Sequence, residues 1–145
     1  MEAVAHAVAQ LGGDVEAVGV GVPGPVVGGV ITTAPNLPGF VEPVPMAVLL
    51  SQRLGRPAAV GNDANLGTLG EWVAGAARGA GFALGVWLGT GVGGGLILDG
   101  RPYVGAFGGA GEFGHMCVRQ GGALCGCGRR GCVEAYAGRA RMEQA

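Results

Sequence analysis

The chain has 145 residues, a formal net charge of −1 and only 13% charged residues. This balance offers no basic surface for nucleic acid or for an anionic membrane, so we expect the chain to bind neither directly. Glycine contributes 33 residues beside a hydrophobic fraction of 49% and without a short repeat. This composition favours a globular chain with many tight turns, holding one modest core or pieces of two domains.

Glycine divides the first half of the chain into short predicted elements. Gly28-Gly29 is a two-residue hairpin signal, and Gly55 is typical of a helix end. In chain order we predict a helix bearing Val4, Val8 and Leu11, a strand over 15–22, a hairpin over 26–31, a rigid loop over 35–40, a helix over 45–54 and a strand over 58–60.

The second half is predicted to contain a helix, two strands and a long glycine-rich loop that begins near residue 105. The residues that mark one apolar face of this helix are Leu66, Leu69, Trp72 and Val73. Buried strands are predicted over 82–88 and 94–98, followed by a turn at Asp99-Gly100. Strands mixed with helices indicate the α/β class.

The stretch 79–98 carries no charge and is long enough to cross a membrane. Seven glycines between positions 81 and 95 argue against that reading, because each disfavours a helix by about 1 kcal/mol relative to alanine. The first residues also lack the basic and apolar segments of a secretion signal. We therefore expect no membrane span and a cytoplasmic location.

One imidazole and three thiols fall within eighteen residues and predict a metal site. The donors are His115, Cys125, Cys127 and Cys132, the number and type that tetrahedral zinc prefers in a closed, structural site. The alternative is a disulfide or free thiols, although Cys125 and Cys127 are too close in sequence to bridge without strain. Cys117 lies outside this set and is expected to be a small buried residue.

The residues between these donors suit a tight metal loop. Gly126, Gly128 and Gly131 allow the backbone to wrap closely, since glycine reaches positive φ without steric cost. Arg129 and Arg130 are expected to offset the excess negative charge of three thiolates on one divalent ion.

Asn62 and Asp63 follow a predicted strand and precede a predicted helix, the edge where open α/β sheets bind ligands. An aspartate there could accept a proton from a substrate hydroxyl while the asparagine holds that substrate. Asp63 could equally cap the helix, since aspartate is an ordinary N-cap residue.

The glycine run 88–95 offers exposed backbone amides to an anion. Its glycines match GxGxxG, but a strand and turn follow where a dinucleotide fold needs a helix, and no Lys-Ser or Lys-Thr completes a Walker A loop. A phosphate-holding hairpin and a tight hairpin packed on a neighbour both remain open.

Six motifs in order along nearly the whole chain resemble those of the sugar-kinase and repressor family called ROK, and most closely its bacterial glucokinases. They are Gly19-Val20-Gly21-Val22-Pro23-Gly24-Pro25, Ala34-Pro35-Asn36-Leu37-Pro38-Gly39-Phe40, Asn62-Asp63-Ala64-Asn65, Leu88-Gly89-Thr90-Gly91-Val92-Gly93-Gly94-Gly95, Gly111-Glu112-Phe113-Gly114-His115 and Cys125-Gly126-Cys127-Gly128-Arg129-Arg130-Gly131-Cys132-Val133-Glu134.

The resemblance implies an actin-like, ribonuclease-H-like α/β fold with two lobes closing on a cleft. Residues 1–66 would be part of the smaller N-terminal lobe, and residues 67–145 would begin the larger lobe with the phosphate hairpin and the zinc site. Family kinases open with an Asp-x-Gly-Gly-Thr motif that this sequence lacks, and they continue past the zinc segment. We therefore expect a fold that is incomplete at both ends, and a 145-residue chain that does not turn over ATP alone.

The resemblance also implies roles for individual residues. Asp63 would be the catalytic base that takes the proton from the sugar 6-hydroxyl as it attacks the γ-phosphate of ATP. Zinc would be structural, with His115 touching both metal and sugar, and Mg²⁺ would accompany ATP. The implied sugar ligands are Asn36, Asn62, Glu112, His115 and Glu134, and the implied phosphate loop is Gly89, Thr90, Gly91, Val92 and Gly93.

The expected function is ATP-dependent phosphorylation of a hexose, with glucose as the substrate and a homo-oligomer as the assembly. The alternatives are a sugar-responsive repressor of the same family and an N-acetylhexosamine or fructose kinase. Two departures bear on sugar preference: Gly61 stands where many family kinases have glutamate, and Phe40 where tryptophan is common.

Overall fold

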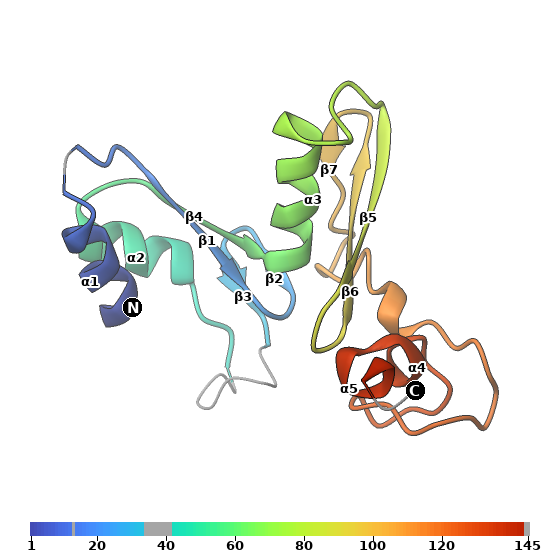
Figure 1. Cartoon of the computed structure of the whole chain (residues 1–145). Coiled ribbons are helices and arrows are strands. Elements are labelled where there is room, and N and C mark those ends of the chain that lie inside the picture. Colours follow the sequence, from blue (N-terminus) through green and yellow to red (C-terminus); the bar gives the residue numbers. More distant parts are fainter. Residues whose placement is uncertain (13, 34–41, 144–145) are drawn as a thin grey trace. The chain divides into compact units, whose positions relative to one another are not determined.

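A computed structural model describes residues 1–12, 14–33 and 42–143 (Figure 1). The chain divides into two compact units, Met1–Asp63 and Ala64–Ala145. The boundary predicted between residues 66 and 67 falls inside helix α3 (Asp63–Ala74), three residues after the observed division. The assignment of the two segments to a smaller and a larger lobe stays a prediction.

In its described residues, 1–12, 14–33 and 42–63, the first unit contains two helices and two small sheets. Its elements are α1 (Glu2–Gln10), β1 (Val18–Val22), β2 (Val26–Val27), β3 (Val30–Ile31), α2 (Met46–Leu54) and β4 (Ala58–Asn62). Strand β1 pairs with β4 in parallel, and β2 pairs with β3 antiparallel. The helices and strands predicted for this half are present, but β1 begins at Val18 instead of residue 15.

Glycines form the turns of this unit as the sequence predicts. Gly28 and Gly29 have φ values of 57° and 78°, the left-handed pair that a two-residue hairpin turn requires. Gly55 ends α2 with φ 64°, and its amide donates to the Ser51 carbonyl.

A small apolar cluster stabilises the first unit. Val26 and Ile31 are buried, and Val22, Met46 and Val60 pack against them. This cluster joins α2 to the strands, so the hairpin and the parallel pair share one core.

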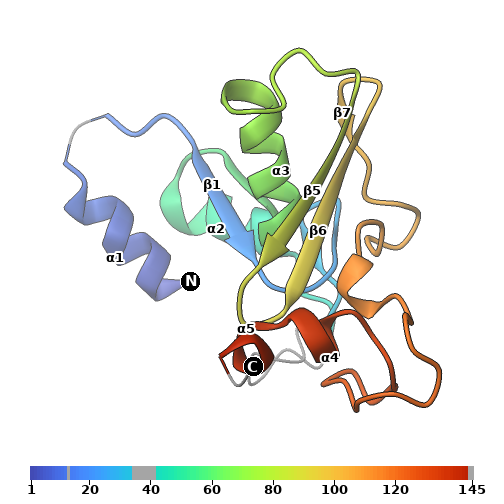
Figure 2. The ribbon, with the colours of Figure 1, turned by 45° about the vertical axis from the view of Figure 1, so that its right-hand side comes forward.

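The second unit contains α3, a three-stranded antiparallel sheet and an irregular segment rich in cysteine. After α3 its elements are β5 (Phe82–Leu88), β6 (Val92–Leu98), β7 (Arg101–Pro102), η1 (Phe113–His115), α4 (Glu134–Ala137) and α5 (Arg139–Met142). The sheet order is β5-β6-β7, and α3 runs along the β5–β6 hairpin in Figures 1 and 2. Asp99 and Gly100 turn into β7 with φ values of 49° and 72°.

The apolar face predicted for α3 is wrong at two of its four residues, since Leu69 and Trp72 are half-buried but Leu66 and Val73 are exposed. Thr68 is only 2% exposed, whereas Leu66 is 36% and Val73 is 57% exposed. The cause is the glycine content of the sheet: a Cβ at Gly95 would lie 2.5 Å from Thr68 Oγ1 and 3.0 Å from the Ala64 carbonyl oxygen. The helix therefore approaches β6 closely through small residues, and Thr68 accepts a 3.0 Å hydrogen bond from the Trp87 indole.

The prediction of two buried strands holds for one of them. Ile97 of β6 is fully buried, but on β5 Phe82 is 67%, Leu84 59% and Val86 53% exposed. The uncharged stretch 79–98, which is long enough to cross a membrane, forms the β5–β6 hairpin instead of a helix. Among the helices of residues 1–12, 14–33 and 42–143, none has the length and apolar character to span a membrane.

Candidate metal centre and ligand-binding residues

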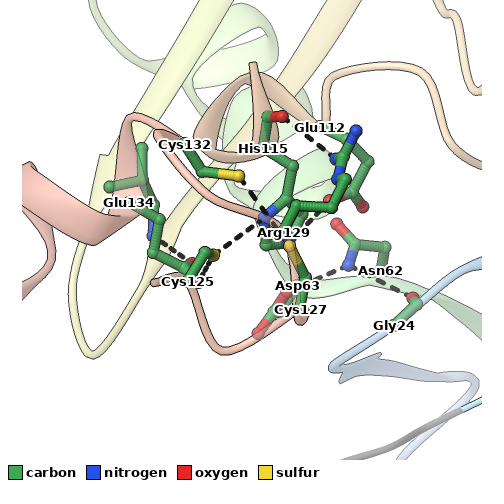
Figure 3. Close-up of polar contacts among 11 residues, drawn as sticks. Gly24, Asn62, Asp63, Glu112, His115, Cys125, Cys127, Arg129, Cys132 and Glu134 are labelled. Carbon is green, nitrogen blue, oxygen red and sulfur yellow. Dashed lines mark hydrogen bonds and ion pairs between the residues drawn. The ribbon is translucent and has the colours of Figure 1, made fainter. Parts of the chain in front are cut away.

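Four potential metal donors converge in the second unit, as the sequence predicts. His115 ends η1, Cys125 and Cys127 lie in the following loop, and Cys132 precedes α4. Their ligand atoms all lie within 4.8 Å of one another, and Figure 3 shows the side chains pointing toward a common centre.

Two of the six separations between the donor atoms match a tetrahedral ion. A tetrahedron with metal–sulfur bonds of about 2.3 Å has edges of about 3.8 Å. The observed separations are 3.8 Å from Cys127 Sγ to Cys132 Sγ and 3.7 Å from Cys125 Sγ to His115 Nδ1. A disulfide would need sulfurs about 2.05 Å apart, and all four cysteines of the chain are free thiols.

The loop between the donors needs the positive φ of glycine at two of the three positions predicted. Gly128 and Gly131 have φ values of 84° and 83°, whereas Gly126 has no positive φ and open space around it. A Cβ at Gly131 would also collide with the Arg119 carbonyl oxygen. Backbone pairing of Cys117 with Cys132 and of Leu124 with Arg130 closes the loop.

The thiols of the cluster differ in acidity. Burial raises the pKa of Cys125 to about 11, because the anion is poorly solvated there. The backbone amide of Arg129, and then its guanidinium, lower the pKa of Cys127 to about 6. Arg129 thus offsets charge as predicted, whereas the Arg130 guanidinium donates to the Gly122 carbonyl at 3.2 Å and its predicted role stays a prediction.

The expectation of a buried Cys117 is wrong. The residue is exposed, and its thiol lies 3.6 Å from the Arg130 carbonyl oxygen. Cys117 is not among the four clustered donors, as predicted. Its backbone pairs with that of Cys132, but only the Cys132 side chain belongs to the donor group.

His115 presents its two ring nitrogens to different groups. Nδ1 lies 3.7 Å from Cys125 Sγ, and Nε2 lies 3.8 Å from Glu112 Oε2. The second separation is longer than a hydrogen bond, so a small polar group could bridge Nε2 and the carboxylate. This geometry suits the expected double role of His115, with Nδ1 as the metal donor.

Glu134 lies at the start of α4, two residues after Cys132. Its Oε2 accepts a 3.0 Å hydrogen bond from the Val92 amide, and its Oε1 lies 3.5 Å from the Cys125 thiol. Sequence reasoning singled out Glu134 but missed its contact with Val92, because no periodicity connects residues 42 positions apart.

The glycine run forms a tight turn between β5 and β6. The Gly89 amide donates to the Gly91 carbonyl at 2.9 Å, and Thr90 is exposed at the tip. The expectation of exposed amides fails at Val92, which is only 4% exposed and bonded to Glu134. Gly93 already belongs to β6.

Asn62 and Asp63 lie where the sequence predicts, at the carboxyl end of β4. Asn62 is the last residue of β4 and donates from Nδ2 to the Gly24 carbonyl at 3.2 Å. Because β1 and β4 are parallel, the loop after β1 and the end of β4 meet at one sheet edge. Asp63 is exposed, begins α3 and accepts a 3.2 Å hydrogen bond from Asn62.

The remaining predicted sugar ligand, Asn36, lies outside the described residues, as does the loop over 35–40. Of the other predicted site residues, the structure brings together the metal donors with Glu112, Glu134 and Val92 in the second unit. Asn62 and Asp63 contact each other in the first unit.

Comparison with known proteins adds a family likeness to this geometry. The sequence matches the profile of the ROK family over residues 1–145. A glucokinase of Streptomyces coelicolor is 41% identical over 150 residues, which covers 100% of this chain and 47% of the relative. An N-acetyl-D-glucosamine kinase of Pectobacterium atrosepticum is 43% identical over 131 residues, covering 82% of this chain and 42% of the relative.

A solved structure agrees with the sequence comparison. The ROK family glucokinase of Streptomyces griseus, crystallised with glucose and AMPPNP, is 39% identical and has a TM-score of 0.82. The likeness covers 99% of this chain and 48% of that chain, so the chain spans about half the length of its relatives. The α/β fold of actin-like, ribonuclease-H-like type expected from the sequence is confirmed for the part that this chain covers.

Proposed function

Because the chain belongs to the ROK family, we propose that its protein transfers the γ-phosphoryl group of ATP to the 6-hydroxyl of a hexose, with glucose as the substrate. The observation that carries this proposal is the placement of Asp63 and Asn62 at the carboxyl end of β4, beside the loop after β1. The related Streptomyces griseus enzyme, which was crystallised with glucose and AMPPNP, supports the choice of ligands.

Asp63 is the proposed base. Its exposed carboxylate begins α3, and Asn62 Nδ2 orients it through the 3.2 Å hydrogen bond. Phosphoryl transfer needs little covalent chemistry from the protein, so correct placement of the attacking hydroxyl accounts for most of the rate. A carboxylate that accepts the hydroxyl proton fulfils that need.

Zinc is the proposed ion of the cysteine-rich segment, and its role is structural. One nitrogen and three sulfurs are the donors that zinc prefers; they lie within 4.8 Å of one another and would fill all four positions. A closed shell leaves no open position for substrate. The ion would therefore order His115 and the start of α4 rather than act on the sugar directly.

The proposed sugar ligands of the second unit include one metal donor, His115, and two carboxylates that lie beside metal donors, Glu112 and Glu134. His115 Nε2 and Glu112 Oε2 face each other across 3.8 Å, a separation that a sugar hydroxyl could bridge. Glu134 offers Oε1, and Asn62 and Asn36 are the proposed ligands of the first unit. Residues 89–93 form the proposed phosphate loop, and Mg²⁺ enters with ATP.

The test is Asp63→Asn in the full-length protein, assayed with glucose, ATP and Mg²⁺. Turnover should fall by about 10²–10⁴ while glucose affinity measured by calorimetry changes little. Asp99→Asn is the matched control, because asparagine tolerates the φ of 49° at that turn, and it should leave turnover unchanged. Equal turnover of wild type and Asp63→Asn would refute the assignment.

The same assay separates the alternatives. Phosphorylation of N-acetylhexosamines or fructose in preference to glucose would keep the chemistry and change the substrate. Glucose binding by wild-type protein without any phosphorylation would favour a sugar-responsive regulator instead.

A further inference from the structure

One carboxylate of the second unit contacts both the metal donors and the glycine hairpin. Glu134 Oε2 accepts the Val92 amide at 3.0 Å. Its Oε1 lies 3.5 Å from the Cys125 thiol, as Figure 3 shows for the side chains of Glu134 and Cys125. A hydrogen bond to a charged acceptor is stronger than one between neutral groups. Val92 is 4% exposed, so loss of Glu134 would leave its buried amide without this acceptor and would favour opening of the turn to water.

Additional contacts hold the hairpin turn on the segment that begins with Glu134. The Arg139 amide donates to the Gly89 carbonyl at 2.9 Å. A Cβ at Gly91 would collide with Glu134 Oε2, and a Cβ at Gly138 would lie 3.1 Å from the Thr90 carbonyl oxygen. The turn and the α4–α5 segment are therefore closely packed, without room for a side chain between them.

The position of Glu134 depends on the metal donors. Cys132 lies two residues before it and is only 1% exposed, and the Cys132 carbonyl accepts the Ala135 amide at 3.0 Å in the first turn of α4. An ion held by Cys132 and Cys125 would fix this backbone from one side. A metal-bound Cys125 thiolate has no proton to donate, so Oε1 would be released while Oε2 keeps the Val92 amide.

We propose that Glu134 is a positioning residue that couples the metal centre to the glycine hairpin through the Val92 amide. With metal bound, the start of α4 is fixed and Glu134 holds the hairpin in one conformation. Without metal, α4 loosens, the Val92 amide opens more often, and the hairpin binds its anion less well. The nature of that anion, a nucleotide triphosphate, rests on the proposed function, whereas the coupling rests on the contacts of Glu134.

Amide hydrogen exchange at Val92 tests the coupling without any activity measurement. The samples are zinc-loaded and chelator-treated full-length protein, each as wild type and as Glu134→Ala. In the wild type, zinc removal should accelerate exchange at Val92 by about tenfold to a hundredfold, the range implied by losing a hydrogen bond to a charged group. In Glu134→Ala, exchange should be fast with and without zinc.

Two variants control for unrelated effects. Glu71 also accepts a backbone amide, that of Ala76 at 2.8 Å, so Glu71→Ala removes the same kind of bond elsewhere in the unit and should leave Val92 exchange unchanged. Glu134→Gln keeps a side-chain oxygen acceptor and should restore part of the protection. The Ile97 amide in β6 reports whether a variant has lost the sheet as a whole.

Three results would overturn the proposal. One is slow Val92 exchange in zinc-loaded Glu134→Ala, and another is an equal effect of zinc removal in wild type and Glu134→Ala. The third is loss of the whole sheet in Glu134→Ala, seen as amide exchange at Ile97 as fast as at Val92, together with the same fast exchange in Glu134→Gln. Titration with AMPPNP is a separate arm: failure of wild type to bind it would contradict the proposed function but leave the exchange result to decide the coupling.

Discussion

Three glycines of the cysteine-rich loop differ in their surroundings, and alanine substitution should separate them by free energy of unfolding. Gly126 has no positive φ and no atom near its missing Cβ. Gly128 has the same open space but a φ of 84°. Gly131 has a φ of 83°, and its Cβ would meet the Arg119 carbonyl oxygen and lie 3.2 Å from Cys117 Sγ.

The expected magnitudes follow from these differences. Gly126→Ala should be neutral or stabilise by up to about 1 kcal/mol, because alanine restricts only the unfolded chain. Gly128→Ala should cost about 1–2 kcal/mol for the left-handed backbone. Gly131→Ala adds about 1–3 kcal/mol of overpacking to that conformational cost, since the obstructing atom belongs to the backbone and cannot rotate away.

Urea denaturation of the metal-free variants measures these costs, and competition with a chromophoric chelator measures zinc affinity. Because the donors converge only when the loop adopts this conformation, the penalties should appear in zinc binding as well. At about 1.4 kcal/mol per tenfold, Gly131→Ala should bind zinc at least about thirtyfold more weakly than Gly126→Ala. Equal stability of the three variants, or Gly126→Ala as the least stable, would refute the reasoning.

Three further predictions concern packing, acidity and metal removal. Gly95→Ala should lower the free energy of unfolding by about 1–3 kcal/mol, because its Cβ would lie 2.5 Å from Thr68 Oγ1, whereas Gly81→Ala, with nothing within 4 Å, should be tolerated in the same denaturation assay. In metal-free protein, thiolate absorbance should include a step near pH 6 from Cys127 and a step near pH 11 from Cys125; a wild-type titration without the lower step would contradict this assignment. Cys127→Ser should weaken zinc and glucose binding together, and tight glucose binding by metal-free protein would disprove the link.

Much of the candidate site could be predicted because it depends on short spacings. The donors His115, Cys125, Cys127 and Cys132 are close in sequence, and a loop of that length can bring their ligand atoms to within 4.8 Å. Asn62 could likewise be placed, since a strand followed by a helix puts the intervening residues at the sheet edge.

Other features of the site could not be predicted from the sequence. The hydrogen bond from Val92 to Glu134 joins residues far apart in the chain, and only the packing of α4 against the hairpin creates it. Free cysteine is usually buried, but Cys117 is exposed. A helix or strand turns one face toward the core, whereas the side chains of a loop follow no such periodic pattern.

The sequence by itself determined the turns and the donor set: Gly28, Gly29 and Gly55 adopt the left-handed backbone that glycine alone reaches cheaply. Only the tertiary structure decided which face of α3 is buried. There the absence of side chains at Gly85 and Gly95 lets the helix approach the sheet through Thr68, while Val73 remains 57% exposed. Hydrophobic spacing describes one element at a time, whereas burial depends on the shape of the surface that the element meets.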